Sequence, residues 1–211
     1  MPSSFNWPEL YFIRHGETSW NLEGRYQGSK DIPLNDTGRG QADLNGKLLK
    51  RLLERAGRNS EEFDWYVSPL SRTRETMERV RAAFRGAAVL EVVPDERLIE
   101  ISFGVFEGQL HTDLAAGAMP IAGERDASFW YFRPPEGESY DDLASRVADF
   151  GGSLKRRAII VSHGGVLRVL RRLIEDFPPD RAVNWFPPQD SVIHFADGKA
   201  TVYPAGTEWD E

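Results

Sequence analysis

A histidine between an arginine and a glycine, at the end of an apolar run, is the first feature of this chain that can do chemistry. Residues 10–13 are aromatic or aliphatic, which predicts a buried strand, and Arg14-His15-Gly16 follow at once. The imidazole of His15 can serve as a nucleophile or base, and the Arg14 guanidinium can clamp an oxyanion. Alternatively, His15 only satisfies the polar groups at its own strand end.

Two further predicted strands lead to residues of the same kinds. Residues 158–161, the most apolar run of the chain, precede His163 by one residue, and residues 64–67 lead through a Ser-Pro turn to Arg72. Parallel strands deliver their carboxyl ends to one edge of a sheet, where open α/β sheets bind ligands, so both arginines and both histidines are expected to converge. Guanidinium groups bind phosphoryl oxygens bidentately, and the helix predicted after His163 adds backbone N–H donors. The constellation therefore indicates a phosphate site.

Other kinds of site fit the sequence less well. The four histidines, at positions 15, 111, 163 and 194, show none of the close spacings typical of metal ligands, so no metal and no other cofactor is expected. The chain lacks the Gly-x-x-x-x-Gly-Lys-Ser/Thr loop, which excludes a P-loop protein. Because it has no cysteine, disulfides, thiolate metal sites and cysteine nucleophiles are excluded as well.

Length and charge bound the remaining possibilities. The 211 residues are enough for an ample core, and we expect one domain over residues 1–211. The formal net charge of −7 argues against nucleic acid or an anionic membrane as a partner. The first residues show no signal peptide, and no apolar run approaches the roughly 18 residues of a membrane span, so a cytoplasmic protein is expected.

Strands and helices alternate along the chain, which predicts a three-layer α/β/α sandwich with a mainly parallel central sheet. The remaining predicted elements are helices over residues 42–56, 71–84, 139–150 and 166–174, and strands over residues 87–93, 191–195 and 200–203. Residues 19–34 are polar and are expected to form an irregular, functional loop. Residues 109–137 are expected to form a lid-like insertion with a short helix near 112–118.

Short sequence blocks spread over residues 11 to about 165 suggest a family. They are Arg14 to Thr18 with Trp20-Asn21, Tyr26-Gln27-Gly28, Asp31 to Leu34, Thr37-Gly38 with Gln41-Ala42, Ser68 to Thr73 with Thr76, Leu98-Ile99-Glu100 with Phe103-Gly104, Glu107-Gly108, Gly137-Glu138-Ser139 and Ser162-His163-Gly164. In content and order these blocks resemble the phosphatase branch of the histidine phosphatase (phosphoglycerate mutase-like) superfamily. The resemblance implies phosphoryl-transfer chemistry.

The resemblance also implies a role for each matching residue. His15 matches the nucleophile, which is phosphorylated during turnover, and Glu100 matches the acid that serves the leaving group. The other matches are a phosphate pocket of Arg14, Arg72 and His163, with Asn21 and the Gly164 backbone beside it, and a substrate side lined by Gln27 and Gly28. Preorganised donors of this kind compensate the charge on the transferred phosphoryl group without a metal.

The family contains both phosphatases and mutases, so the fold does not decide the reaction. The Ser68 to Thr73 and Tyr26 to Gly28 blocks resemble the phosphatase versions, and only Arg133 stands where mutases carry paired arginines for a phosphoglycerate carboxylate. We therefore expect a metal-independent, histidine acid phosphatase-type phosphomonoesterase that hydrolyses a small phosphorylated metabolite through a phosphohistidine and releases inorganic phosphate. The alternatives are a 2,3-bisphosphoglycerate-dependent mutase and a catalytically silent phosphate-ligand or protein-binding module. The substrate and the oligomeric state stay open.

Several chemically capable residues have no role implied by the resemblance. His111 is expected to decorate the surface or the lid, and His194 and Glu107 are expected to be structural. Residues 130–133 (Trp-Tyr-Phe-Arg) either roof the substrate pocket or pack the lid. Arg74, Arg79 and Arg81 are expected to form a solvated helix face.

Overall fold

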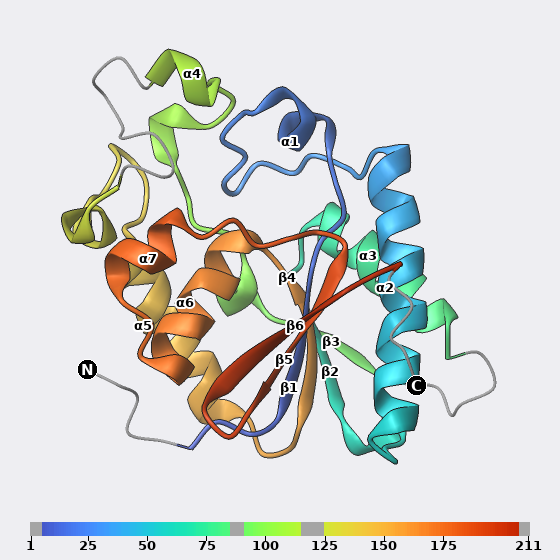
Figure 1. The fold of residues 1–211 in the computed structure, drawn as a ribbon. Helices are drawn as coiled ribbons and strands as arrows, with labels where there is room; N and C mark the ends of the chain where they lie inside the picture. Colours follow the sequence, from blue (N-terminus) through green and yellow to red (C-terminus); the bar gives the residue numbers. More distant parts are fainter. Residues whose placement is uncertain (1–5, 85–90, 115–124, 207–211) are drawn as a thin grey trace.

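The computed structural model describes residues 6–84, 91–114 and 125–206 (Figure 1). One six-stranded sheet has the order β3-β2-β4-β1-β5-β6. Its strands are β1 Leu10–Arg14, β2 Asp64–Val67, β3 Val92–Pro94, β4 Ala158–Ser162, β5 Ser191–Ala196 and β6 Lys199–Pro204. The first four strands in this order are parallel to one another, β5 pairs antiparallel with β1, and β6 pairs antiparallel with β5. The predicted α/β class with a mainly parallel sheet is confirmed.

Helices cover both faces of the sheet, which gives three layers (Figure 1). One face carries α2 Asp36–Arg55 and α3 Ser71–Ala82, and the other carries α5 Tyr140–Ser153, α6 Gly164–Glu175 and α7 Pro179–Asn184. Because successive strand residues point to opposite faces, Tyr11 and Ile13 pack on the α2–α3 side, whereas Leu10 and Phe12 pack on the α5–α6 side. Strands covered on both sides are typically continuous apolar runs, and β1 and β4 are apolar up to their last residues, Arg14 and Ser162.

The register of the central strands sets up the site. Ile13 pairs with Val161 and Arg14 pairs with Ser162, so β1 and β4 end side by side. The N–H of His15 donates to the Ser162 carbonyl at 2.9 Å, which extends this ladder by one residue. His15 and His163 are therefore neighbours although they lie far apart in the sequence, as convergence of the strand ends requires.

Helix starts follow local chemistry. The Asn35 side chain accepts from the Gly38 N–H at the start of α2, and the Ser139 side chain accepts from the Asp142 N–H at the start of α5. Such caps satisfy N–H groups that have no partner inside the helix. Within residues 6–84, 91–114 and 125–206, no helix combines the length and the apolar character that crossing a membrane would require.

The connections differ most from the sequence-based expectation. The stretch predicted to be irregular over residues 19–34 contains α1, Ser19–Glu23, because Thr18 and Asn21 cap each other's backbone N–H groups. The short helix expected near residues 112–118 is α4 His111–Leu114, and its remainder lies outside the described residues. The 3-10 helices are η1 Ser60–Glu62, η2 Glu96–Leu98, η3 Gly104–Phe106 and η4 Ala127–Tyr131.

Two further differences concern a strand and a helix. Of the strand predicted over residues 87–93, only Val92 and Val93 are paired with β2, together with Pro94; residues 87–90 lie outside the described part. The sequence-based interpretation missed α7, which a proline opens and which is only six residues long. The lid-like insertion over residues 109–137 is described only in part, so its lid character stays a prediction.

Candidate active site

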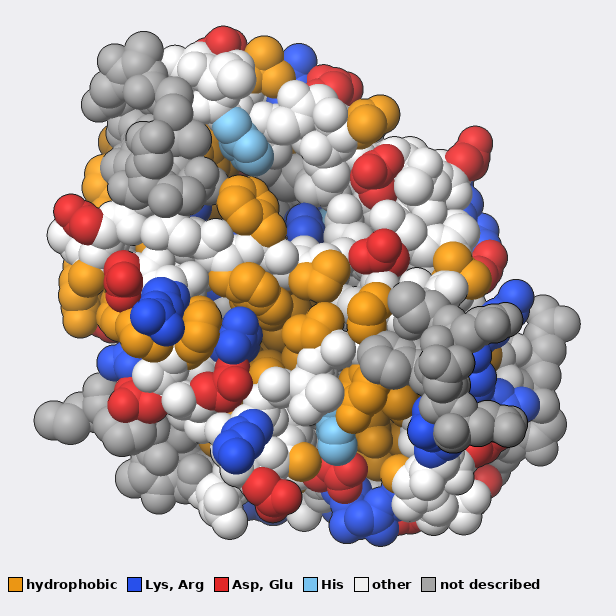
Figure 2. All heavy atoms as spheres, viewed as in Figure 1, with side chains coloured by type: hydrophobic (Ala, Val, Ile, Leu, Met, Phe, Trp, Pro, Cys, Tyr) orange, Lys and Arg blue, Asp and Glu red, His pale blue; other side chains and the backbone are white. Residues whose placement is uncertain are grey.

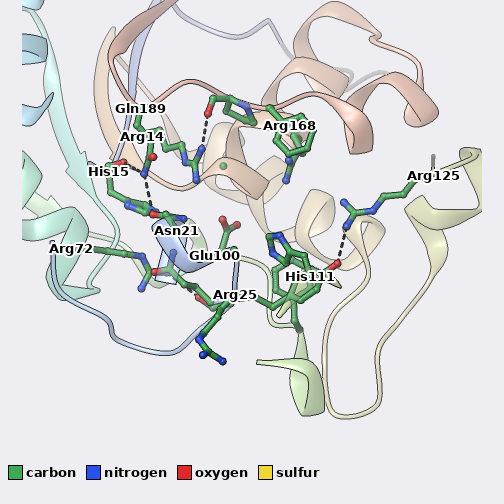
Figure 3. A pocket seen from close by; sticks show the side chains of 18 residues that line it. Arg14, His15, Asn21, Arg25, Arg72, Glu100, His111, Arg125, Arg168 and Gln189 are labelled. Atoms are coloured by element: carbon green, nitrogen blue, oxygen red, sulfur yellow. Dashed lines mark hydrogen bonds between the residues drawn. The ribbon is translucent and has the colours of Figure 1, made fainter. Parts of the chain in front are cut away.

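A cavity of about 340 Å³ lies at the carboxyl ends of the parallel strands (Figure 3). It is lined by eight of the nine predicted site residues: Arg14, His15, Asn21, Gln27, Gly28, Arg72, Glu100 and Gly164. The ninth, His163, does not line the cavity. It is completely buried beside His15, and the two ring centroids are 5.1 Å apart. Stretches distant in the sequence thus meet at one place.

The surroundings of His15 fix both its tautomer and its charge. Its Nδ1 lies 2.7 Å from the Gly16 carbonyl oxygen. Because a carbonyl oxygen only accepts, Nδ1 carries the proton and Nε2 keeps the lone pair. Burial, and then the nearby Arg72 and Arg14 charges, hold the pKa of His15 well below the ordinary 6.5. An imidazole that is neutral and oriented in this way is suited to nucleophilic attack.

Main-chain carbonyl groups hold Arg14 and Arg72, two of the arginines that line the cavity. Arg14 Nη1 donates to the Pro187 carbonyl at 2.6 Å, and Arg72 donates to the carbonyls of Lys30 at 2.7 Å and Gly28 at 2.9 Å. Burial, with the charge of a neighbouring arginine, lowers the pKa of Arg14 to about 10, and burial also lowers the pKa of Arg72. Both groups still carry a full positive charge at neutral pH. Carbonyl partners orient these cations without neutralising them.

Three buried polar atoms around His15 have no hydrogen-bond partner in the described part of the chain. They are Nε of Arg14, Nε of Arg72 and Nδ1 of His163. His163 Nε2 lies 2.8 Å from the Ser68 hydroxyl oxygen, and Nδ1 of His163 carries the proton in the tautomer whose Nε2 accepts from that hydroxyl. Buried donors without partners are costly, and two of these belong to cations. An oxyanion such as a phosphoryl group in the cavity would be a partner for the two guanidinium groups that line it, with His163 directly beside His15.

Glu100 supplies the carboxylate that lines the cavity. It lies in an irregular segment after η2, and its oxygens accept from the N–H groups of Gly165, at 3.0 and 3.1 Å, and Ile101, at 2.9 Å. The approach to α6 is close: a Cβ on Gly165 would lie 2.2 Å from Glu100 Oε1. The glycine therefore makes room for the carboxyl group at the cavity wall.

The predicted substrate-side residues lie around the same cavity. The Asn21 amide oxygen accepts from Gln189 Nε2 at 3.0 Å, and the same nitrogen donates to the His15 carbonyl at 3.2 Å. Gly28 has a positive φ of 53°, and a Cβ there would lie 2.0 Å from the Glu107 carboxylate. The Gln27 side chain is buried, and its Oε1 has no partner in the described part of the chain. Its amide is therefore available to a ligand.

Other lining residues were not predicted from the sequence. They are Gly24, Arg25, Tyr26, Phe103, His111, Arg125, Arg168, Phe186, Pro187 and Gln189. Arg168 could have been predicted, because it lies on the basic helix that follows His163 in the sequence. Its Nε donates to the Trp185 carbonyl and its Nη1 to the Tyr140 hydroxyl. Figure 2 shows apolar and basic side chains gathered across the middle of this face, below the loops that carry α1 and α4.

His111, which was expected to decorate the surface or the lid, is exposed and lies on α4, in the segment predicted to be a lid. Its ring lines the cavity and packs edge-on against Tyr26, with 4.2 Å between ring centroids. Burial, followed by the charges of Arg125 and Arg168, lowers the pKa of His111. The sequence-based interpretation missed this because the contact joins residues far apart in the chain, in segments without periodicity.

The remaining candidates lie outside the cavity. His194 bonds to Glu9 at 2.9 Å on β5, and the Glu107 carboxylate accepts from Ser29, Ser102 and Phe103 in the connections. Trp130 is buried in the core on the α5–α6 side, and Tyr131 is exposed. Among the described residues, no three histidine, aspartate or glutamate side chains are grouped as metal ligands would be.

Comparison with known proteins places these features in a family. Residues 10–203 match the model of the histidine phosphatase superfamily, branch 1. The chain is 34% identical over 175 residues to phosphoglycerate mutase-like protein 4 of Arabidopsis thaliana, covering 78% of this chain and 70% of that protein. It is 31% identical over 201 residues to a metal-independent phosphoserine phosphatase of the same organism, covering 90% and 78%.

A solved structure of a similar protein has the same fold. The phosphoglycerate mutase of Thermus thermophilus superposes with a TM-score of 0.67 at 32% identity, covering 95% of this chain and 99% of that one. Phosphatases and mutases thus both occur among the similar proteins. The match spans the strands that carry Arg14, His15 and His163 as well as the connections that complete the cavity. The chain belongs to the histidine phosphatase superfamily.

Proposed function

We propose that this protein is a phosphomonoester hydrolase that transfers the phosphoryl group of a small metabolite to His15 and then to water. The observation that carries the proposal is the set of three unpartnered buried atoms, on Arg14, Arg72 and His163, around a neutral His15. These groups suit the three equatorial oxygens of a transferred phosphoryl group, while His15 Nε2 is the atom that attacks.

In the first step, His15 Nε2 forms a bond to phosphorus while the bond from phosphorus to the ester oxygen breaks. The departing alkoxide takes a proton from the protonated carboxyl group of Glu100. In the second step, the oxygen of a water molecule forms a bond to phosphorus while the bond from phosphorus to His15 Nε2 breaks, which releases inorganic phosphate. The water gives a proton to the Glu100 carboxylate, which restores the acid. One carboxyl group thus serves as acid and then as base.

The charge balance supports metal independence. Arg14 and Arg72 bring two fixed positive charges to the cavity, and neither is neutralised by the carbonyl groups that hold it. Cationic donors of this kind can compensate the charge on a phosphoryl group in place of a divalent ion. The similar phosphoserine phosphatase named as metal-independent supports the same proposal.

The far part of the cavity would take the rest of the substrate. Tyr26, Phe103 and Phe186 offer apolar surface there, and Arg168 and Arg125 offer positive charge. A volume of about 340 Å³ limits the substrate to a small molecule. We propose a metabolite that has polar or acidic groups beside its phosphate ester.

A phosphoglycerate mutase is the second candidate. The observation that favours it is the pair Arg125 and Arg168, which could hold a carboxylate beside the phosphate. Against it, Arg133 pairs with Asp142 and does not line the cavity. The residues that phosphoryl transfer would use, among them His15 and Glu100, line one cavity, which disfavours a catalytically silent binding module.

Two assays separate these functions. With p-nitrophenyl phosphate and a panel of small phosphate esters, we expect release of inorganic phosphate, at a rate unchanged by a chelator and abolished in His15→Ala. With 3-phosphoglycerate and 2,3-bisphosphoglycerate, we expect no isomerisation faster than phosphate release. Isomerisation that outpaces hydrolysis would establish the mutase, and activity lost to the chelator and restored by a divalent ion would contradict metal independence.

A further inference from the structure

Glu138, in the Gly137-Glu138-Ser139 block, has no part in the chemistry described so far and does not line the cavity. It forms a two-point ion pair with Arg146 of α5: Nε donates to Oε1 at 3.0 Å and Nη2 donates to Oε2 at 2.9 Å. The two side chains are 29% and 21% exposed, so the pair is mostly shielded from water.

Arg146 also holds the segment that carries Glu100. Its Nη1 donates to the carbonyls of Arg97 at 2.8 Å and Ile99 at 2.6 Å, and its Nη2 donates to the Glu100 carbonyl at 3.1 Å. Together with the two bonds to Glu138, these contacts use all five N–H donors of the guanidinium group. A lysine could not reproduce this arrangement, because it has no planar fork.

Glu138 holds the same segment from its other side. Its Oε2 accepts from the Ser102 N–H at 3.0 Å, and its own N–H donates to the Ser102 carbonyl at 2.9 Å. Residues 99–102 belong to no helix or strand, so no regular ladder fixes their path. The ion pair therefore fixes the backbone before and after Glu100 through hydrogen bonds. In a helix or strand, the regular backbone hydrogen bonds would do this.

We propose that Glu138 and Arg146 are positioning residues that hold Glu100 where it can give its proton to the leaving group. The Glu100 carboxyl group lies against the backbone of Gly165. A Cβ placed on this glycine would be only 2.2 Å from Oε1 of Glu100. A shift of the supporting backbone would therefore move the carboxyl group relative to the bound ester. Displacement of about 1 Å commonly costs a catalytic group about 100-fold in rate. This inference rests on the proposed role of Glu100 as the acid.

The test compares two esters of similar size that differ in their need for a proton. Benzyl phosphate leaves as a poor alkoxide that needs the acid, whereas p-nitrophenyl phosphate leaves unaided. For each ester, kcat/KM reports the steps up to departure of the alcohol, which is phosphorylation of His15. We expect Arg146→Lys and Glu138→Gln to lower kcat/KM for benzyl phosphate by about 10- to 100-fold and that for p-nitrophenyl phosphate by less than about 3-fold.

Arg157→Lys is the matched control. Arg157 pairs with Glu9 at 2.7 Å just before the amino-terminal ends of the central strands β4 and β1, so its substitution alters an ion pair without touching the Glu100 segment. We expect the ratio of the two kcat/KM values to stay unchanged in this variant. Melting temperatures of all variants would show how much general stability each one loses.

Glu100→Gln, measured in parallel, separates the two levels of the proposal. It should show the same selective loss on benzyl phosphate, and to a greater extent. If it does, and the Arg146 and Glu138 variants lower kcat/KM equally for both esters, the positioning role is wrong while the acid role stands. If Glu100→Gln itself treats both esters alike, the acid role is wrong, and the positioning role falls with it. Should Arg146→Lys fail to fold, Glu138→Gln decides.

Discussion

The positive charges of Arg14 and Arg72 are held in place by main-chain carbonyl groups, which carry no net charge. Their partners are the carbonyls of Pro187, Gly28 and Lys30, which orient the guanidinium groups and leave their charge for a ligand. The sequence predicted both arginines, because each follows a predicted strand. It could not predict the carbonyl partners, because those come from irregular segments far along the chain.

Arg72→Ala should lower kcat/KM for a phosphate ester by about 100-fold or more, since removing one donor to transition-state charge has typically that effect. Arg74, two residues further along α3 and exposed, is the matched control, and Arg74→Ala should leave kcat/KM within about 2-fold of the wild type. A loss below about 3-fold in Arg72→Ala would place Arg72 outside the phosphate pocket.

At the scale of elements, apolar periodicity predicted the central strands and the main helices. All residues of β1 and β4 except the last of each are apolar because helices cover both sheet faces, and that pattern is visible in the sequence. The start of α1 depends on a reciprocal cap between Thr18 and Asn21 in a polar stretch, which no hydrophobic period signals. The same holds for the Glu100 segment, whose support comes from side-chain hydrogen bonds.

Close packing between elements also escapes sequence patterns. Gly16 follows His15 where the chain leaves β1, and a Cβ there would lie 2.1 Å from the Gly38 carbonyl of α2. The glycine in the Arg-His-Gly triplet therefore allows α2 to approach the end of β1. The triplet was visible in the sequence, whereas this reason for its glycine needed the structure.

At the scale of the whole molecule, two buried histidines tie stability to pH. Burial and the neighbouring arginine charges hold the pKa values of His15 and His163 well below 6.5 in the folded protein. In the unfolded chain both regain ordinary values. As the pH falls below the ordinary value, the unfolded chain therefore binds protons that the folded protein does not, and stability falls. The slope approaches about 1.4 kcal/mol per pH unit for each histidine.

Urea unfolding between about pH 7 and about pH 5 measures this effect. The double variant His15→Asn, His163→Asn should lose less stability over this range than the wild type does. Carboxylates with lowered pKa values, such as those of Glu9 and Asp95, are common to both proteins, so their contribution cancels in the difference. Parallel stability curves would show that the two histidines are not buried in their neutral form.

The sheet brings cationic and imidazole groups to one edge of a chain whose formal net charge is −7. The central claim is that His15 carries the phosphoryl group between ester and water. Brief incubation with a radiolabelled phosphate ester, followed by quenching in alkali, measures this directly. We predict a protein-bound phosphoryl group that is stable to alkali, labile to acid and located on His15, and no label in His15→Ala. A wild-type protein that turns over without label, or label that persists in His15→Ala, would contradict the claim.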